Sequence, residues 1–83
     1  MINGLYVIKD EKVGFLQVQQ DTNDLTAKRN FNFAMTQPDT LYYNNRKDFS
    51  LWKVGTFDTV TGEVILEDSL SLVLRAEDLF NEI

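Results

Sequence analysis

The chain has 83 residues, of which 43% are hydrophobic, and a formal net charge of −5. This length fits a single domain, residues 1–83, whose folding hides only about 60–65% of the unfolded chain's surface. Cysteine and histidine are absent, which excludes disulfides, thiolate zinc sites, cysteine nucleophiles and the commonest general base. The four glycines form no phosphate-binding loop. We therefore expect no enzyme, no metal and no cofactor.

No apolar run approaches the roughly 18 residues of a membrane span, and residues 1–4 lack the pattern of a signal peptide. We expect a soluble protein of the cytoplasm that does not contact membranes. A chain this short can bury more apolar surface only by associating with itself, because it has no disulfide or thiolate zinc site to stabilise it. The sequence therefore favours a homo-oligomer, with a dimer as the simplest form.

The first predicted element is a β-hairpin. Residues 5–9 are β-prone and apolar at nearly every position, residues 10–14 read as a turn closed by Gly14, and residues 15–19 form a second strand. Strict alternation in the second strand places Phe15 on the same side as Gln17 and Gln19, and it places Leu16 and Val18 on the opposite side.

One helix is predicted between residues 21–23, which are N-cap types, and Pro38, which prevents extension beyond about Gln37. At about 100° per residue, one stripe of the helix faces the sheet; its members are Ala27, Phe31, Ala34 and Met35. Phe33 lies outside this stripe, on the side of Arg29, and Lys28 is also off the stripe. Phe33 either stacks on Arg29 or contacts a base or a partner protein.

Residues 38–48 read as a loop because they are rich in asparagine and aspartate. This loop combines the aromatic rings of Tyr42 and Tyr43 with the charges of Arg46 and Lys47. At least one tyrosine is expected to anchor the loop to the core.

A second hairpin, residues 49–66, is the clearest element. Two runs of aromatic and β-branched residues flank a loop of three to five residues, in which Asp58 accepts turn hydrogen bonds and Gly62 takes a positive φ. Alternation places Phe49 and Leu51 on one face and Trp52 on the other. Three alternatives follow: both faces are covered, Gly55 marks a bulge, or the Trp52 face meets a partner.

Residues 70–75 alternate well enough for a fifth strand, although a helix starting at Ser69 competes with it, and residues 76–80 form a short turn or helix that docks Leu79 and Phe80. The predicted fold is α+β. It is a small antiparallel sheet of four to five strands in the order β-β-α-β-β, followed by the fifth strand, with one helix packed on a face.

Charge is unevenly distributed along the chain. Residues 28–53 carry five basic and two acidic side chains, a net of +3, whereas residues 54–83 carry one basic and seven acidic groups, a net of −6. Six of the ten aromatic residues lie in the basic segment. Basic groups interleaved with aromatic rings are what a single-stranded nucleic acid site requires, because cations neutralise phosphates and rings stack on unpaired bases. Aromatic residues also fill cores, so the pattern alone leaves both interpretations open.

Two segments carry a family resemblance. Asn23-Asp24, Ala27, Arg29, Phe31 and Ala34 fit an ND-x-x-A-x-R-x-F-x-x-A pattern, and residues 48–63 fit a DF-x-L-x-x-x-G-x-FD-x-x-TGE pattern. With the opening Leu-Tyr-Val-Ile-Lys-Asp, the chain resembles the small nonstructural DNA-binding protein of gokushovirus-type microviruses over roughly residues 5–66. These phages have single-stranded DNA genomes. The resemblance implies single-stranded DNA binding in the bacterial host, during genome replication or packaging.

We therefore expect a phage protein whose basic side chains bind phosphates and whose exposed rings stack on bases. The candidate DNA-binding residues are Lys28, Arg29, Phe33, Tyr42, Tyr43, Arg46, Lys47, Trp52 and Lys53. The alternative is an interaction module for scaffolding or virion assembly that binds viral coat or replication proteins through its Phe33 and Trp52 faces and does not contact DNA.

Overall fold

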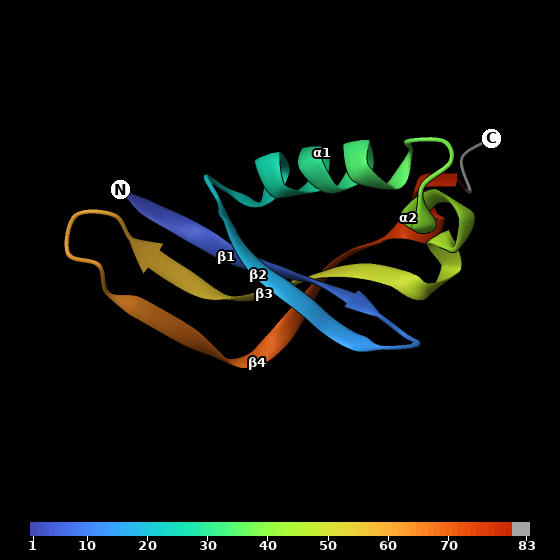
Figure 1. Ribbon diagram of the computed structural model, residues 1–83. Helices are drawn as coiled ribbons and strands as arrows, with labels where there is room; N and C mark the ends of the chain where they lie inside the picture. Colours follow the sequence, from blue (N-terminus) through green and yellow to red (C-terminus); the bar gives the residue numbers. More distant parts are fainter. Residues whose placement is uncertain (81–83) are drawn as a thin grey trace.

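The computed structural model describes residues 1–80, apart from the side chain of Phe80. One four-stranded antiparallel sheet has the strand order β2-β1-β3-β4, and helix α1 lies across one of its faces (Figure 1). The elements in chain order are β1 (Ile2–Asp10), β2 (Gly14–Asp21), α1 (Asp24–Met35), α2 (Leu41–Asn44), η1 (Arg46–Asp48), β3 (Phe49–Asp58), β4 (Val64–Arg75) and η2 (Ala76–Phe80).

The predicted α+β class, the antiparallel sheet and the helix on one face are confirmed. The predicted order β-β-α-β-β is not matched, because α2 and η1 lie between α1 and β3. The predicted fifth strand is not present in the described residues. Residues 38–48 are not a plain loop, because α2 and η1 lie within them. Residues 70–75 are not a separate strand either, because β4 runs without interruption from Val64 to Arg75.

The β1–β2 hairpin forms where the sequence predicts it. Gly14 has φ +119°, a value that L-residues with side chains rarely adopt. The Asp10 carboxylate accepts a hydrogen bond from the Lys12 backbone N–H at 2.9 Å and so holds the turn. The predicted sides of the second strand were wrong for Phe15. Val18 pairs with Val7 but Phe15 pairs with Lys9, so a bulge in β2 brings Phe15 to the same face as Val18.

Helix α1 begins and ends as predicted. The side chain of Asn23, at the N-cap, accepts a hydrogen bond from the Thr26 backbone N–H, and the helix ends at Met35, before Pro38. Three of the four residues in the predicted stripe are buried, and Ala34 is half-buried. The helix packs its stripe on the sheet and builds one core; its buried members are Tyr6, Ala27, Phe31, Met35, Phe49, Leu51 and Ala76.

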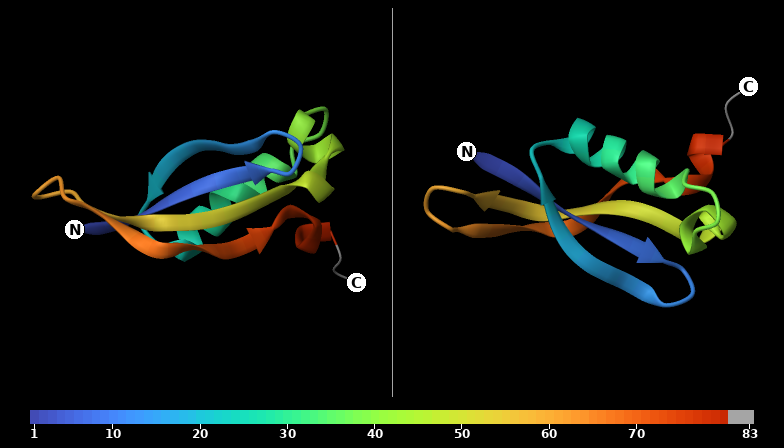
Figure 2. Two further views of the ribbon diagram at one scale, coloured as in Figure 1. Left: turned by 90° about the horizontal axis from the view of Figure 1, so that it is seen from below. Right: turned by 45° about the horizontal axis from the view of Figure 1, so that its top comes forward.

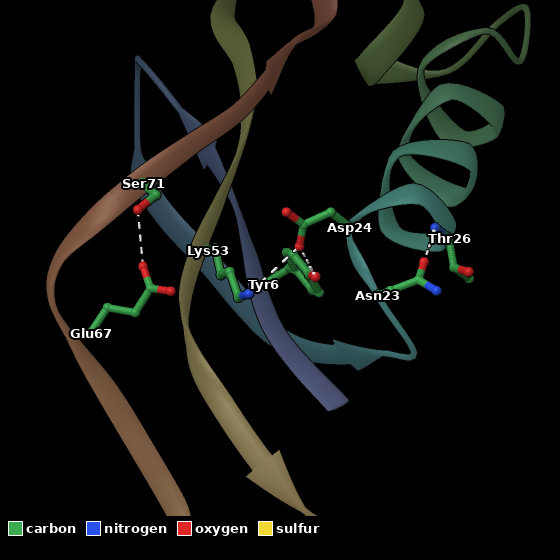
Figure 3. Close-up of polar contacts among 7 residues, drawn as sticks. All are labelled: Tyr6, Asn23, Asp24, Thr26, Lys53, Glu67 and Ser71. Carbon is green, nitrogen blue, oxygen red and sulfur yellow. Dashed lines mark hydrogen bonds and ion pairs between the residues drawn. The ribbon is translucent and has the colours of Figure 1, made fainter. Parts of the chain in front are cut away.

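A polar contact ties the start of α1 to the sheet (Figure 3). The Tyr6 hydroxyl donates a hydrogen bond to Asp24 Oδ1, and the Lys53 ammonium lies 3.7 Å from the same oxygen. Burial of Tyr6 raises the pKa of its phenol, and the hydrogen bond to Asp24 and the negative charge of that carboxylate raise it further. This phenol therefore stays neutral well above pH 10, where an unfolded chain's tyrosine ionises.

This raised pKa predicts alkaline instability that Tyr6→Phe should remove. A group whose pKa is raised by folding contributes stability that is present below its unfolded pKa and declines as pH rises above it, so wild-type stability should fall above about pH 10. At neutral pH, Tyr6→Phe should cost about 1.5 kcal/mol for the lost hydrogen bond to a carboxylate. Urea unfolding at increasing pH measures both effects; a variant that loses stability above pH 10 as steeply as the wild type would contradict this account.

The β3–β4 hairpin extends past the N-terminal end of α1, and β1 pairs with β3 as far as Asp58 (Figure 1). Its loop, residues 59–63, has the predicted length, with Gly62 at φ +80°. Asp58 Oδ1 accepts hydrogen bonds from the backbone N–H groups of Val60 and Thr61, and the first of these is the main reason that the pKa of Asp58 is lowered. Asp58 therefore closes this turn as an ionised carboxylate.

The structure also shows which faces of the second hairpin are covered within the chain. Phe49 and Leu51 are buried on the α1 side. Trp52 pairs with Val7 and Leu72 and lies on the opposite face, which α1 leaves uncovered (Figure 2, left). The register of β3 also shifts next to Gly55, as one of the predicted alternatives required.

The short helix η2 follows β4 directly. Ala76 is buried and Leu79 packs against the core, as predicted for this segment. The predicted docking of the Phe80 side chain lies outside the part of the chain that the structure describes.

Candidate functional site

The nine predicted DNA-binding residues do not form one continuous surface. They fall into three groups, on α1, on the α2–η1 segment, and on the two faces of β3. On α1, the side chains of Lys28, Arg29 and Phe33 are all exposed, and Phe33 is 68% exposed. Lys28 and Arg29 line a groove of about 520 Å³ in which Leu25, Leu74 and Leu79 supply apolar walls. Phe33 is not among the residues that line this groove.

The α2–η1 segment brings four of the predicted residues together. Tyr42 anchors it, because its ring packs edge-on against Phe49 with the centroids 4.9 Å apart. The prediction that at least one tyrosine anchors this segment to the core is therefore confirmed for Tyr42. The guanidinium of Arg46 lies 5.1 Å from the centre of the Tyr43 ring, and its Nη1 donates a hydrogen bond to the Tyr43 carbonyl at 3.1 Å.

The local sequence explains why this segment is compact. Thr40 is the N-cap of α2, and its hydroxyl accepts a hydrogen bond from the Tyr43 backbone N–H at 3.1 Å. Asn45 follows α2 and its side-chain amide donates to the Leu41 carbonyl at 3.0 Å. The backbone N–H of Asp48 then donates to the Asn45 carbonyl and closes η1. Arg46 and Lys47 are thus held on a short, capped double turn.

A groove of about 440 Å³ lies between this double turn and the β1–β2 turn. Three cationic side chains line it, and they come from both segments: Lys12, Arg46 and Lys47. Asp48 is the one carboxylate among the lining residues. The two segments are joined by a hydrogen bond from the Glu11 backbone N–H to the Asp48 carbonyl at 2.8 Å. We call this feature the basic groove.

Trp52 and Lys53 lie on opposite faces of β3. Lys53 points to the α1 side, where its ammonium pairs with Asp24. The Trp52 indole N–H donates to Ser50 Oγ at 2.8 Å on the uncovered face, and its ring meets Phe15 edge-on at 6.4 Å. The Lys9 ammonium lies 5.4 Å from the Phe15 ring centre and 5.9 Å from that of Trp52.

Sequence reasoning missed three residues that belong with the predicted ones. Lys12 completes the basic groove, and Lys9 and Phe15 surround Trp52. The basic segment was defined along the chain as residues 28–53, whereas these three lie before it. Pairing the first strand with the second hairpin would have placed Lys9 and the Lys12 turn near residues 46–52, but the sequence does not determine which strands are neighbours.

Neither a metal site nor a membrane-spanning helix has a candidate among the described residues. In residues 1–80 no group of three or more acidic side chains is placed to hold a metal ion. No helix in the same part of the chain is long and apolar enough to cross a membrane.

Comparison with known proteins gives one match. A family model described as "Phage ORF5 protein" matches residues 3–79, which is most of the chain. No curated protein and no solved structure matches the chain.

Proposed function

Because the chain belongs to the Phage ORF5 protein family, we propose that it is a non-enzymatic protein that binds single-stranded DNA in the cytoplasm of the bacterial host. The observation that carries this proposal is the basic groove, where three cations from two separate segments converge although the chain as a whole is acidic. The resemblance to proteins of single-stranded DNA phages supports the choice of ligand. The same resemblance leads us to propose that the protein acts during genome replication or packaging.

The groove offers the chemistry that a phosphate backbone needs. Lys12 and Lys47 are exposed ammonium groups that act as point charges, and the Arg46 guanidinium has a planar fork of donors that fits phosphate oxygens. Tyr43 packs against the guanidinium from one side and is half-buried, and an unpaired base is expected to stack on its ring.

The predicted residues outside the basic groove have different roles in this proposal. Lys28, Arg29 and Phe33 form a second exposed basic and aromatic area on α1, which a longer strand reaches after it leaves the groove. Tyr42 supports the site from the core, and Lys53 is paired with Asp24. Trp52 lies on the uncovered sheet face, beside Phe15, and is left out of the DNA contact.

The acidic remainder of the chain sets the strength of binding. A net charge of −5 repels DNA at long range, so attraction is confined to the groove and the α1 area. Binding through three phosphate contacts predicts a modest affinity that falls quickly with salt, which suits a protein that must be removed from the genome again.

The double variant Lys12→Gln, Lys47→Gln tests the groove. Each phosphate contact to single-stranded DNA adds about 0.7 to the salt dependence of log K, so the slope should fall in magnitude by about 1.4 when both ammonium groups are removed. Fluorescence anisotropy of a labelled oligothymidine at several salt concentrations measures this slope. Both residues are exposed, so the fold should be preserved, and circular dichroism checks it.

Lys28→Gln is the matched control, because it removes the same charge from an exposed position on α1. For a long strand, Lys28→Gln should reduce the slope by at most about 0.7, the value for one phosphate contact. For an oligomer that only fills the groove, it should leave the slope unchanged. If Lys28→Gln weakens binding of the short oligomer as much as the double variant does, the groove is not the binding site.

A protein-interaction module remains the second candidate function. The groove that Lys28 and Arg29 line on α1 favours a protein partner. Its apolar walls, Leu25, Leu74 and Leu79, offer a peptide more contact area than a phosphate backbone can use. A viral coat or replication protein is the expected partner in that case. Such an apolar contact would persist as salt is added, whereas phosphate binding would not.

A further inference from the structure

A pocket between β2 and α1 has no role in the phosphate contacts of the proposed function. Its volume is about 150 Å³, and an apolar cavity of about this volume is large enough for a benzene-sized ring. The less exposed part of its lining is apolar; the residues there include Ile8, Phe31, Ala34, Tyr42 and Leu51. Ala34 is the one residue of the predicted helix stripe that is not fully buried, and it borders this cavity. We call the cavity the strand–helix pocket.

Carboxamide groups line the more exposed part of the strand–helix pocket. Gln17 and Gln19 lie two residues apart on β2, and both are exposed. Neither side chain has a hydrogen-bond partner within residues 1–80. Each carboxamide offers a carbonyl acceptor and two N–H donors, which is the chemistry that reads the edge of an unpaired base. Asn30 is already paired, because its Nδ2 donates a hydrogen bond to Asp21 Oδ1 at 2.8 Å and so joins α1 to β2.

The charge of the lining favours a base over a phosphate. Of the described residues that line the strand–helix pocket, none is cationic and Asp21 is anionic. A phosphate would meet this carboxylate with no opposite charge beside it. A neutral base would instead meet apolar side chains, the rings of Phe31 and Tyr42, and the two carboxamides of β2. The pocket and the basic groove thus suit different parts of one nucleotide chain.

The strand–helix pocket adjoins the basic groove through α2. Tyr42 of this helix lines the pocket, and Asn44, two residues later, lines the groove. At 3.6 residues per turn these two side chains lie on opposite sides of the helix, so the two sites are separated by the width of a helix, roughly 10 Å. With one phosphate per roughly 3.4 Å of a strand, three nucleotides span this distance. A strand bound in the groove can therefore reach the pocket.

We propose that the strand–helix pocket takes one pyrimidine base of the single strand whose phosphates lie in the basic groove. This inference rests on the proposed function, since it assigns a place to a base of the same ligand. The volume of the pocket fits a single six-membered ring and not the fused double ring of a purine. Phosphate contacts carry no sequence information, so the pocket is the part of the site that makes the protein prefer pyrimidine-rich DNA.

Two oligomers of equal length, oligothymidine and oligodeoxyadenylate, test the pocket against the groove. Equal lengths give equal numbers of phosphates, so the groove alone would bind both oligomers alike. The wild type should bind oligothymidine about tenfold more tightly, because one well-stacked base contributes about this factor to affinity. Competition against a labelled oligothymidine, followed by fluorescence anisotropy at low salt, measures the ratio of the two affinities.

Two variants remove the pocket in different ways. Ala34→Leu fills it from α1, and the double variant Gln17→Ala, Gln19→Ala removes the carboxamides from β2. Each should lower the preference for oligothymidine to about twofold or less, since one base contact is lost. Each should also leave the salt dependence of binding unchanged, because the cations of the basic groove remain. Circular dichroism checks the fold, and the exposed glutamines decide the test if Ala34→Leu is misfolded.

Gln20→Ala is the matched control on the same strand. Gln20 is exposed, its Oε1 accepts a hydrogen bond from Asn3 at 3.0 Å, and it does not line the pocket, so this variant should keep the full preference. Equal binding of both oligomers by the wild type overturns the pocket assignment while the basic groove stands, and so does a preference that the pocket variants retain. Failure of the wild type to bind either oligomer at low salt overturns the proposed function and the pocket assignment together.

Discussion

Phe31→Ala should lower the free energy of unfolding by about 3–5 kcal/mol, the usual cost of removing a large aromatic side chain from a core. Phe31 is 3% exposed and belongs to the buried cluster that joins α1 to the sheet. A domain of this size has a total stability of only about 4–12 kcal/mol, so the loss would remove between about a quarter and all of it. Urea unfolding followed by circular dichroism measures the change.

Phe33→Ala provides the control within the same helix. Phe33 is 68% exposed, and alanine is the better helix former, so this variant should stay within about 0.5 kcal/mol of the wild type. Equal losses for the two phenylalanines would show that the amphipathic orientation of α1 is wrong.

Gly55→Ala should destabilise the protein by about 3 kcal/mol, at the upper end of what overpacking costs. A Cβ atom at this position would lie 2.3 Å from the Ile65 carbonyl oxygen and 3.0 Å from the Leu66 Cα. Both are backbone atoms of the neighbouring strand, so the clash cannot be relieved by a side-chain rotation. The same denaturation experiment tests this prediction.

Gly62→Ala separates this close approach from a purely conformational effect. Gly62 has φ +80° but nothing lies within 4 Å of the position of an added Cβ. Its cost should be about 1–2 kcal/mol, which is the penalty for a side chain in the left-handed region. A Gly55→Ala variant that is no less stable than Gly62→Ala would show that β3 and β4 do not approach so closely.

The sequence predicted well those parts of the fold that depend on neighbouring residues. The N-cap at Asn23 and the barrier at Pro38 define a helix through local backbone chemistry, and the stripe of Ala27, Phe31 and Met35 identifies its buried face. Asp58 and Gly62 likewise define the second hairpin through hydrogen bonds within its own turn.

The errors concern features that depend on strand partners. The β2 bulge that turns Phe15 to the Trp52 face is visible only in the register with β1. The predicted fifth strand, residues 70–75, is the end of β4, an edge strand that continues through exposed charged residues and pairs with β3 again after a shift in register.

The candidate site illustrates the same limit. Arg46 and Lys47 were found because they adjoin aromatic residues in sequence, but Lys12 joins them only through the hydrogen bond between the β1–β2 turn and η1. Lys53 lies in the predicted basic segment and nevertheless faces Asp24 on the α1 side of the sheet. Charge counted along a chain does not show which cations share a surface.

The measurement that tests the proposed function most directly is the binding of a labelled oligothymidine to the wild-type protein as salt is increased. The basic groove predicts saturable binding at low salt, with log K falling linearly against log salt at a slope of about −2, as three phosphate contacts require. Absence of binding at low salt, or binding that salt does not weaken, would contradict the assignment of single-stranded DNA to this groove.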